Sequence, residues 1–327
     1  MSTDVRFAFA GTPEFAAWVL KHLHDLGRAP VLVISQPDRP RGRGRKMAAA
    51  PAVEAAQALG IPWLTTVNIN EQPVLDALRE RHAQMLIVAA FGQMLRPVLL
   101  DSLPCLNVHA SLLPAYRGAA PIVRALRAGE TETGVCIMRM LPGLDDGPWA
   151  ERSRLTISLR DDAGSLGRKL ALLGAVGVDQ VLTGTADGNL LWTEQVGEAS
   201  YAPKVLPEDR PLDLTLPARL VHAQVRSLSP DIGCDAAVSG LQFKVWRAWP
   251  VGAAETQSLG EAAGIAAEDP GRLAVVGERL FAGCDDGLIE FLRVQPAGKG
   301  PMDAASFLRG YASRLGGRIV PADRDGR

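Results

Sequence analysis

Short apolar runs alternate with amphipathic segments at the start of the chain, and this alternation constrains the fold more than any other feature. Apolar runs at 6–11, 30–35 and 85–90 predict buried strands, and residues 15–26 and 71–81 between them have helical spacing. Strands that alternate with helices in this way form parallel sheets covered by helices. The sequence therefore predicts an α/β domain with a mainly parallel sheet.

The turn after the first strand argues against a dinucleotide-binding site. We expect Thr12 to cap the first helix and Pro13 to be its first residue. The turn offers one glycine, Gly11, whereas the dinucleotide fingerprint needs three. An NAD-dependent activity is therefore disfavoured.

Composition indicates a globular chain with no strong general attraction for nucleic acid or membranes. The 327 residues suggest two domains, 47% of them are hydrophobic, and the net charge is only -1. The four cysteines have no paired spacing and mostly lie in apolar runs, which predicts reduced thiols and a cytoplasmic protein. We see no targeting signal and no run long enough to span a bilayer, so no membrane partner is expected.

The pattern of the chain changes after a long helical segment at 160–182. Periodicity is lost across 189–207, where proline and charge accumulate. Beyond it, a helix at 218–227 precedes short strands at 243–251, 272–276, 280–282 and 289–294, then a helix at 304–315 capped by Asp303. We therefore predict a catalytic domain over 1–188, a linker over 189–207, and a smaller domain with an OB-like β-barrel over 208–327.

Asn107 and His109 are the first candidates for chemistry. They lie two residues apart in an apolar run, so both side chains would point to the same face of a strand. An amide beside an imidazole can hold a developing oxyanion and move a proton, as acyl transfer requires. Asp145 follows another apolar run and could orient the imidazole if the two strand ends meet. On these residues alone, a core histidine and a simple Asp-Asp-Gly turn stay open alternatives.

A cluster of cations spaced by glycine and proline follows the second predicted strand. It cannot form a regular helix or a core strand, and its density favours phosphate groups. A solvated surface loop is the alternative interpretation. The five cations are Arg39, Arg41, Arg43, Arg45 and Lys46.

Four blocks of sequence, in order, resemble the folate-dependent formyltransferases, and most closely those members that act on methionyl-tRNA. The resemblance extends from about Phe7 to about Gly310. It implies a Rossmann-like catalytic domain in which Asn107, His109 and Asp145 are catalytic, and no metal ion is needed. The blocks are Asn107-Val108-His109, Ser111-Leu112-Leu113-Pro114, Arg117-Gly118-Ala119-Ala120-Pro121 and Gly143-Leu144-Asp145-Asp146-Gly147.

The resemblance also implies a formyl donor and an acceptor for this chain. The donor would be 10-formyltetrahydrofolate and the acceptor initiator methionyl-tRNA, bound by a monomer and formylated for translation initiation. Folate-binding residues would be Phe91, Gly92, Met94, Ser111, Leu112, Leu113 and Pro114. Contacts to tRNA would come from the five clustered cations, from Lys204 and from the C-terminal domain over 208–327.

The sequence departs from the family pattern near the predicted site. Phe91 stands where a tyrosine is often found, and Leu141, Pro142 and Asp146 replace an acidic residue and a threonine. Register alone favours Asp145 over Asp146. The rival functions are formyl transfer to an amino sugar nucleotide or a purine ribotide, folate or RNA binding without turnover, and hydrolysis of the formyl donor. The clustered cations and the second domain favour tRNA.

Overall fold

The computed structural model describes residues 5–41 and 46–319, and the chain divides into two compact units. The N-terminal unit comprises Met1–Pro121, Glu132–Ile157 and Leu166–Lys204. The C-terminal unit comprises Ile122–Thr131, Ser158–Ser165 and Val205–Arg327. The domain and linker boundaries drawn from the sequence stay predictions, and each unit is described by itself below.

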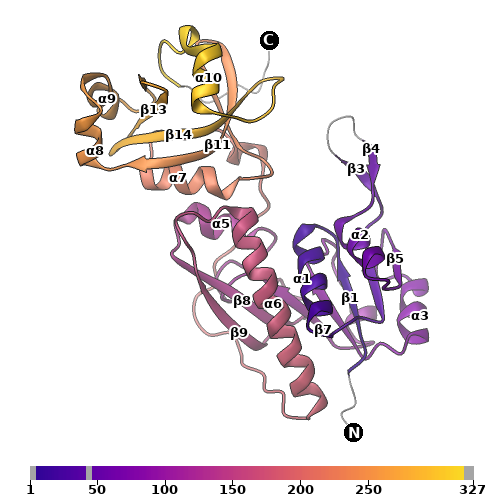
Figure 1. Cartoon of the computed structure of the whole chain (residues 1–327). Coiled ribbons are helices and arrows are strands. Elements are labelled where there is room, and N and C mark those ends of the chain that lie inside the picture. The colour runs from indigo at the N-terminus through magenta and orange to yellow at the C-terminus, as the bar shows by residue number, and fades with distance from the viewer. Residues whose placement is uncertain (1–4, 42–45, 320–327) are drawn as a thin grey trace. The chain divides into compact units, whose positions relative to one another are not determined.

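A seven-stranded sheet forms the centre of the N-terminal unit, in the order β5-β2-β1-β6-β7-β8-β9 (Figure 1). Neighbours from β5 to β7 run parallel, whereas β8 and β9 are antiparallel additions. The predicted α/β class and mainly parallel sheet are confirmed. The strands are β1 (Phe7–Gly11), β2 (Leu32–Ser35), β5 (Trp63–Thr65), β6 (Met85–Ala89), β7 (Cys105–His109), β8 (Glu132–Arg139) and β9 (Trp149–Thr156).

Burial explains why these runs are almost entirely apolar. Every residue of β1 and of β6 is buried, as expected for parallel strands covered on both faces. The long helix α6 lies against β7 and β8, and Gly174 permits the close approach, since a Cβ there would lie 2.6 Å from Cγ1 of Val108. The helices of this unit are α1 (Glu14–Asp25), α2 (Pro51–Ala58), α3 (Gln72–Glu80), α4 (Pro97–Leu100) and most of α6 (Ala163–Ala186). Helix α5 (Pro121–Ala128) belongs, apart from Pro121, to the C-terminal unit.

The start of α1 differs from the expectation. Pro13 is extended and occupies the N-cap position, so the prediction that Thr12 caps this helix is wrong. The Thr12 hydroxyl instead donates to the carbonyl oxygen of Phe91, at 3.1 Å. The Thr12 hydroxyl therefore joins the segments that follow β1 and β6 and does not cap the helix.

The clustered cations lie on a small hairpin outside the main sheet. β3 (Arg39–Arg41) and β4 (Lys46–Ala48) pair antiparallel as a separate two-stranded sheet. The structure describes only the backbone of Arg39, Arg41 and Lys46, and Arg43 and Arg45 lie outside the described residues. The expectation that this run forms neither a helix nor a core strand agrees with this hairpin.

The C-terminal unit contains an antiparallel sheet with the strand path β10-β11-β14-β13-β12, and β15 pairs with β14 (Figure 1). Buried side chains of these strands form a core with those of α7 and α10. Within the described residues β10 and β12 end the path, so the predicted OB-like barrel is not confirmed. The strands are β10 (Cys234–Val238), β11 (Leu241–Val251), β12 (Leu273–Val276), β13 (Arg279–Cys284), β14 (Gly287–Pro296) and β15 (Met302–Asp303).

The helices of this unit match the sequence where their patterns are strong. α7 (Ala218–Ser227) has the predicted bounds, and Asp303 caps α10 (Ala304–Tyr311) by accepting from the backbone N–H of Ser306. Sequence reasoning missed β10 and the short helices α8 (Ala253–Ser258) and α9 (Glu261–Ala267). Two 3₁₀ turns, Pro207–Asp209 and Ala312–Arg314, complete the described elements. No helix in the described ranges has the length and apolarity to cross a membrane.

Candidate active site

β7 carries two of the predicted catalytic side chains. Asn107 and His109 are the third and fifth residues of this strand, so they share a face of the sheet, and His109 ends the strand. The neighbouring strand β8 runs antiparallel to β7, with Leu106 opposite Arg139 and His109 opposite Cys136. The end of β8 therefore lies next to the beginning of β7, and the expectation that two adjacent strand ends form the site is wrong.

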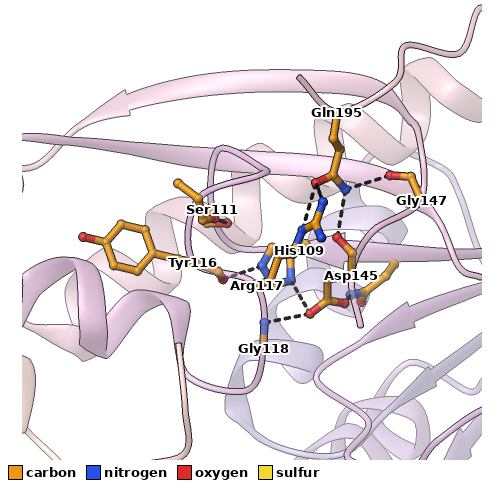
Figure 2. Close-up of polar contacts among 10 residues, drawn as sticks. His109, Ser111, Tyr116, Arg117, Gly118, Asp145, Gly147 and Gln195 are labelled. Carbon is orange, nitrogen blue, oxygen red and sulfur yellow. Dashed lines mark hydrogen bonds and ion pairs between the residues drawn. The ribbon is translucent and has the colours of Figure 1, made fainter. Parts of the chain in front are cut away.

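Asp145 reaches the same place from the loop between β8 and β9. Its Oδ2 lies 3.7 Å from Nδ1 of His109, and its Oδ1 accepts from Nδ2 of Asn107 at 3.4 Å (Figure 2 shows the pair with His109). The backbone N–H of Gly118 donates to Oδ2 at 2.8 Å. The structure thus brings all three predicted side chains together. The side chain of Asp146 makes none of these contacts, so the geometry selects Asp145 from the two neighbouring aspartates.

The imidazole of His109 is held at both nitrogens. Nε2 lies 2.9 Å from the carbonyl oxygen of Tyr116, and the side chain is only 4% exposed. A carbonyl oxygen can only accept, so we assign a proton to Nε2. Nδ1 then faces the carboxylate of Asp145 and is the nitrogen left to exchange a proton. The ring is buried but has a polar partner on each side.

A second pair of side chains holds the loop that carries Asp145. Gln195 Nε2 donates to the carbonyl oxygens of Asp145 and Gly147, each at 2.8 Å (Figure 2). Its Oε1 accepts from Arg117, at 3.1 Å from Nε and 2.7 Å from Nη2. Asp145 itself has a φ of 48°, a conformation that costs energy for a non-glycine residue. Hydrogen bonds from Gln195 stabilise the loop in the form that presents the carboxylate to His109.

Sequence reasoning did not find this clamp. Gln195 lies in the segment interpreted as a linker, 50 residues from Asp145. Arg117 belongs to one of the four resemblance blocks but had no assigned role. A glutamine that donates hydrogen bonds to two carbonyl groups distant in the sequence has no local sequence pattern, so the role of Gln195 could not be predicted from the sequence.

The predicted folate-binding residues at the end of β6 have different environments. Phe91 is 2% exposed and lies in the core, and its carbonyl oxygen accepts from Nε2 of Gln36 at 2.6 Å. Gly92 has a φ of 79°, and a Cβ there would lie 2.9 Å from the same Nε2. The side chain of Met94 is 80% exposed. The side chain of Met94 and the backbone at Gly92 are thus available to a ligand, whereas the Phe91 ring is not.

The remaining predicted folate residues form the turn that follows β7. Ser111 and Leu113 are fully buried, and the Ser111 hydroxyl donates to the carbonyl oxygen of Ala115 at 2.5 Å. Leu112 and Pro114 are half-buried. Because β6 and β7 are parallel neighbours, the turns after them lie at the same edge of the sheet, where open α/β sheets bind ligands. Lys204, predicted to contact tRNA, is exposed at the end of the N-terminal unit.

Known proteins resemble this chain along nearly its whole length. The family model described as formyl transferase matches residues 5–182, and that of the formyl transferase C-terminal domain matches residues 204–312. The methionyl-tRNA formyltransferase of Methylobacterium nodulans is 38% identical over 324 residues, covering 97% of this chain and 99% of that protein. That of Acidithiobacillus ferrooxidans is 38% identical over 326 residues, with coverage of 97% and 99%.

Solved structures share the fold at low sequence identity. HypX from Aquifex aeolicus in complex with tetrahydrofolic acid superposes with a TM-score of 0.66 at 15% identity, covering 96% of this chain and 48% of HypX. This chain therefore spans about half of HypX. The N-formyltransferase of Helicobacter canadensis, in complex with folinic acid and dTDP-3-aminofucose, has a TM-score of 0.62 at 15% identity, covering 89% of this chain and 99% of that one.

Proposed function

The chain belongs to the formyl transferase family, and we infer that it transfers the formyl group of 10-formyltetrahydrofolate to the free α-amino group of methionyl-tRNA. The products are formylmethionyl-tRNA, used in translation initiation, and tetrahydrofolate. The observation that carries this inference is the 38% identity to methionyl-tRNA formyltransferases over 97% of the chain, which includes both units. The polar cluster at the end of β7 provides groups suited to acyl transfer.

The acceptor amine can attack without prior activation by a metal ion. Ordinary α-amino groups titrate near pH 7.7 to 8.0, so a useful fraction of the acceptor is neutral at pH 7. Attack on the formyl carbon places negative charge on the formyl oxygen and a surplus proton on the amine. The protein must therefore stabilise one charge and accept one proton.

Asn107, His109 and Asp145 can meet these two needs. The amide of Asn107 would donate to the charged oxygen, and a donor fixed in advance is effective because little reorganisation is needed. Asp145 orients the ring of His109 through Nδ1, and the contact from the Gly118 N–H holds its carboxylate in place. Nδ1 of His109 would take the surplus proton from the amine, and the adjacent carboxylate would stabilise the charged ring that results.

Different parts of the chain would contact the two substrates. We place the pterin of the folate against Gly92, Met94 and the turn from Ser111 to Pro114, beside the polar cluster. The hairpin formed by β3 and β4 would contact the tRNA, because its clustered cations match a phosphate backbone. Lys204 would add a further contact.

The cellular setting is also a proposal. We propose a cytoplasmic enzyme that acts as a monomer. Its four cysteines are all buried and unpaired, which fits a reducing compartment. Sedimentation of the purified protein at several concentrations would detect a stable oligomer, and such an oligomer would contradict the proposed monomer.

A direct assay with a labelled formyl donor tests the proposed reaction. Label should enter methionyl-tRNA that carries a free amino group, and neither uncharged tRNA nor tRNA whose amino group is acetylated. Label in an amino sugar nucleotide or a purine ribotide would favour those acceptors instead. Release of free formate at the same rate with and without tRNA would identify a hydrolase.

The role of the hairpin is tested by replacing Arg41, Arg43 and Arg45 with alanine together. We expect the KM for methionyl-tRNA to rise at least fivefold at moderate salt, because each lost cation removes a phosphate contact. The KM for the folate should stay within twofold. Arg79→Ala, which removes an exposed arginine paired with Asp76, is the matched control. An unchanged KM for tRNA would show that the cations of the hairpin do not contact the tRNA.

A further inference from the structure

A hollow of about 260 Å³ lies in the C-terminal unit, whereas the three catalytic residues belong to the N-terminal unit. It is lined by α7, by β11 and β14, and by residues 159–162 just before α6, all of which belong to this unit. Two of its side chains, His222 and Arg226, come from successive turns of α7. None of its lining residues has a role in the formyl transfer described above.

Two buried polar side chains line this hollow, and one of them has an unused hydrogen-bond donor. Arg226 is 7% exposed, and Nη1 donates to the carbonyl oxygens of Ser158 and Asp161, at 2.9 and 3.3 Å. Its Nε has no hydrogen-bond partner in the described part of the chain. The imidazole of His222, which is 5% exposed, lines the same hollow. A buried donor without an acceptor destabilises the folded state, so Arg226 favours a ligand that can accept a hydrogen bond from it.

A pair of arginines on neighbouring strands lies beside them. Arg247 on β11 stands directly opposite Arg293 on β14, and the strand register shifts on both sides of Arg247. Like charges directly opposite each other destabilise a sheet, and such irregularities often aim a side chain at a site. Arg293 also lies directly opposite Asp303 of β15, and these three residues border an adjoining hollow of about 350 Å³. Asp303 offsets the charge of Arg293, whereas an anion beside Arg247 would weaken the remaining repulsion.

The acidic residues of the hollow are already occupied. Asp161 accepts from the backbone N–H of Ser158 at 2.9 Å, and Asp162 accepts from that of Ser165 at 2.7 Å. Burial, followed by the charge of Arg226, lowers the pKa of His222 to about 4. The imidazole is therefore neutral at pH 7 and can donate one hydrogen bond and accept another.

An aromatic surface completes the hollow. Trp249 is 37% exposed, and its ring meets that of His222 edge-on, with centroids 5.2 Å apart. Exposed indole rings beside arginines are how proteins hold nucleotides without reading a long sequence, because every base has a flat face. We propose that this hollow binds a single free nucleotide, with its base against Trp249 and its phosphate beside Arg247 and Arg226.

Binding measurements on the full-length protein test this site. The probes are adenosine 5′-monophosphate, adenosine, inorganic phosphate and a single-stranded RNA octamer. Trp249→Ala and Arg247→Gln change exposed side chains, so folding should be preserved, which a thermal melt can check. We expect each to weaken binding of the monophosphate roughly tenfold. Arg272→Gln, which removes the same charge from an exposed arginine at the start of β12, should change it by less than twofold.

The possible outcomes separate a free nucleotide from RNA. Tight binding of the octamer alone, lost in the same two variants, overturns a site for a free nucleotide. Binding of inorganic phosphate as tight as that of the monophosphate overturns the base contact. Binding of every probe unaffected by both variants overturns the site. Formyl transfer is measured separately. If the protein binds the nucleotide but does not transfer a formyl group, the proposed function is contradicted and the proposed nucleotide site is not.

Discussion

Two histidines, one in each unit, are equally buried and have opposite surroundings. His109 is 4% exposed and His222 is 5% exposed. The first lies between a carbonyl oxygen and a carboxylate, both of which can accept a hydrogen bond from the ring. The second lies against Trp249 and near the charge of Arg226, and burial is the larger cause of its low pKa. Burial by itself therefore does not assign a histidine to the core or to catalysis, whereas the atoms facing its nitrogens do.

The largest expected effect is on the turnover number of variants at His109 and its neighbour Asn107. His109→Ala and Asn107→Ala should each lower kcat for formyl transfer by roughly 10²- to 10³-fold, the usual cost of losing one proton acceptor or one oxyanion donor. Steady-state kinetics with methionyl-tRNA measures this, and circular dichroism checks that the fold is retained. His24→Ala, which removes an exposed histidine of α1, is the control and should leave kcat within twofold. Near-native turnover in either active-site variant would remove that residue from the mechanism.

The next effect concerns His222 and pH. In the native protein this ring takes up a proton only near pH 4, whereas in the unfolded chain it does so near 6.5. The unfolded state therefore binds the extra proton first, and native stability falls as pH drops from 6.5 towards 4. Between pH 7 and 4.5 the contribution is about 2–3 kcal/mol of unfolding free energy.

Urea unfolding of the native protein and of His222→Gln at both pH values measures this difference. Glutamine does not titrate, so the variant should lose less stability on acidification by about that amount. Equal losses in the two proteins would show that the surroundings of His222 do not disfavour its charged form.

A smaller effect is expected at the clamp on the Asp145 loop. Gln195→Ala should lower kcat roughly tenfold with little change in the KM for either substrate, because the carboxylate loses its fixed position. Gln195→Glu separates the two sides of the clamp, since it keeps the acceptor for Arg117 and loses the N–H donors to the two carbonyl groups. If the glutamate variant turns over like the native enzyme, the bonds to Asp145 and Gly147 are not what positions the loop.

The sequence by itself determined the elements whose cause is local. Continuous apolar runs predicted β1 and β6, helical spacing predicted α7, and a single aspartate predicted the start of α10. It also placed Asn107 and His109 on one face of a strand, because side chains alternate along every strand. Four short blocks of resemblance led to the family, which the full-length comparisons confirm.

Only the tertiary structure decided which distant groups meet. The antiparallel course of β8, the choice of Asp145 over its neighbour, and the bonds from Gln195 depend on residues 27 to 50 positions apart. The same holds in the C-terminal unit, where Arg247 faces Arg293 across two strands. Periodicity in a sequence indicates which face of a helix or strand is apolar, but it does not indicate which other segment packs against that face. That partner is fixed by how the chain folds back, and the chemistry of both units depends on it.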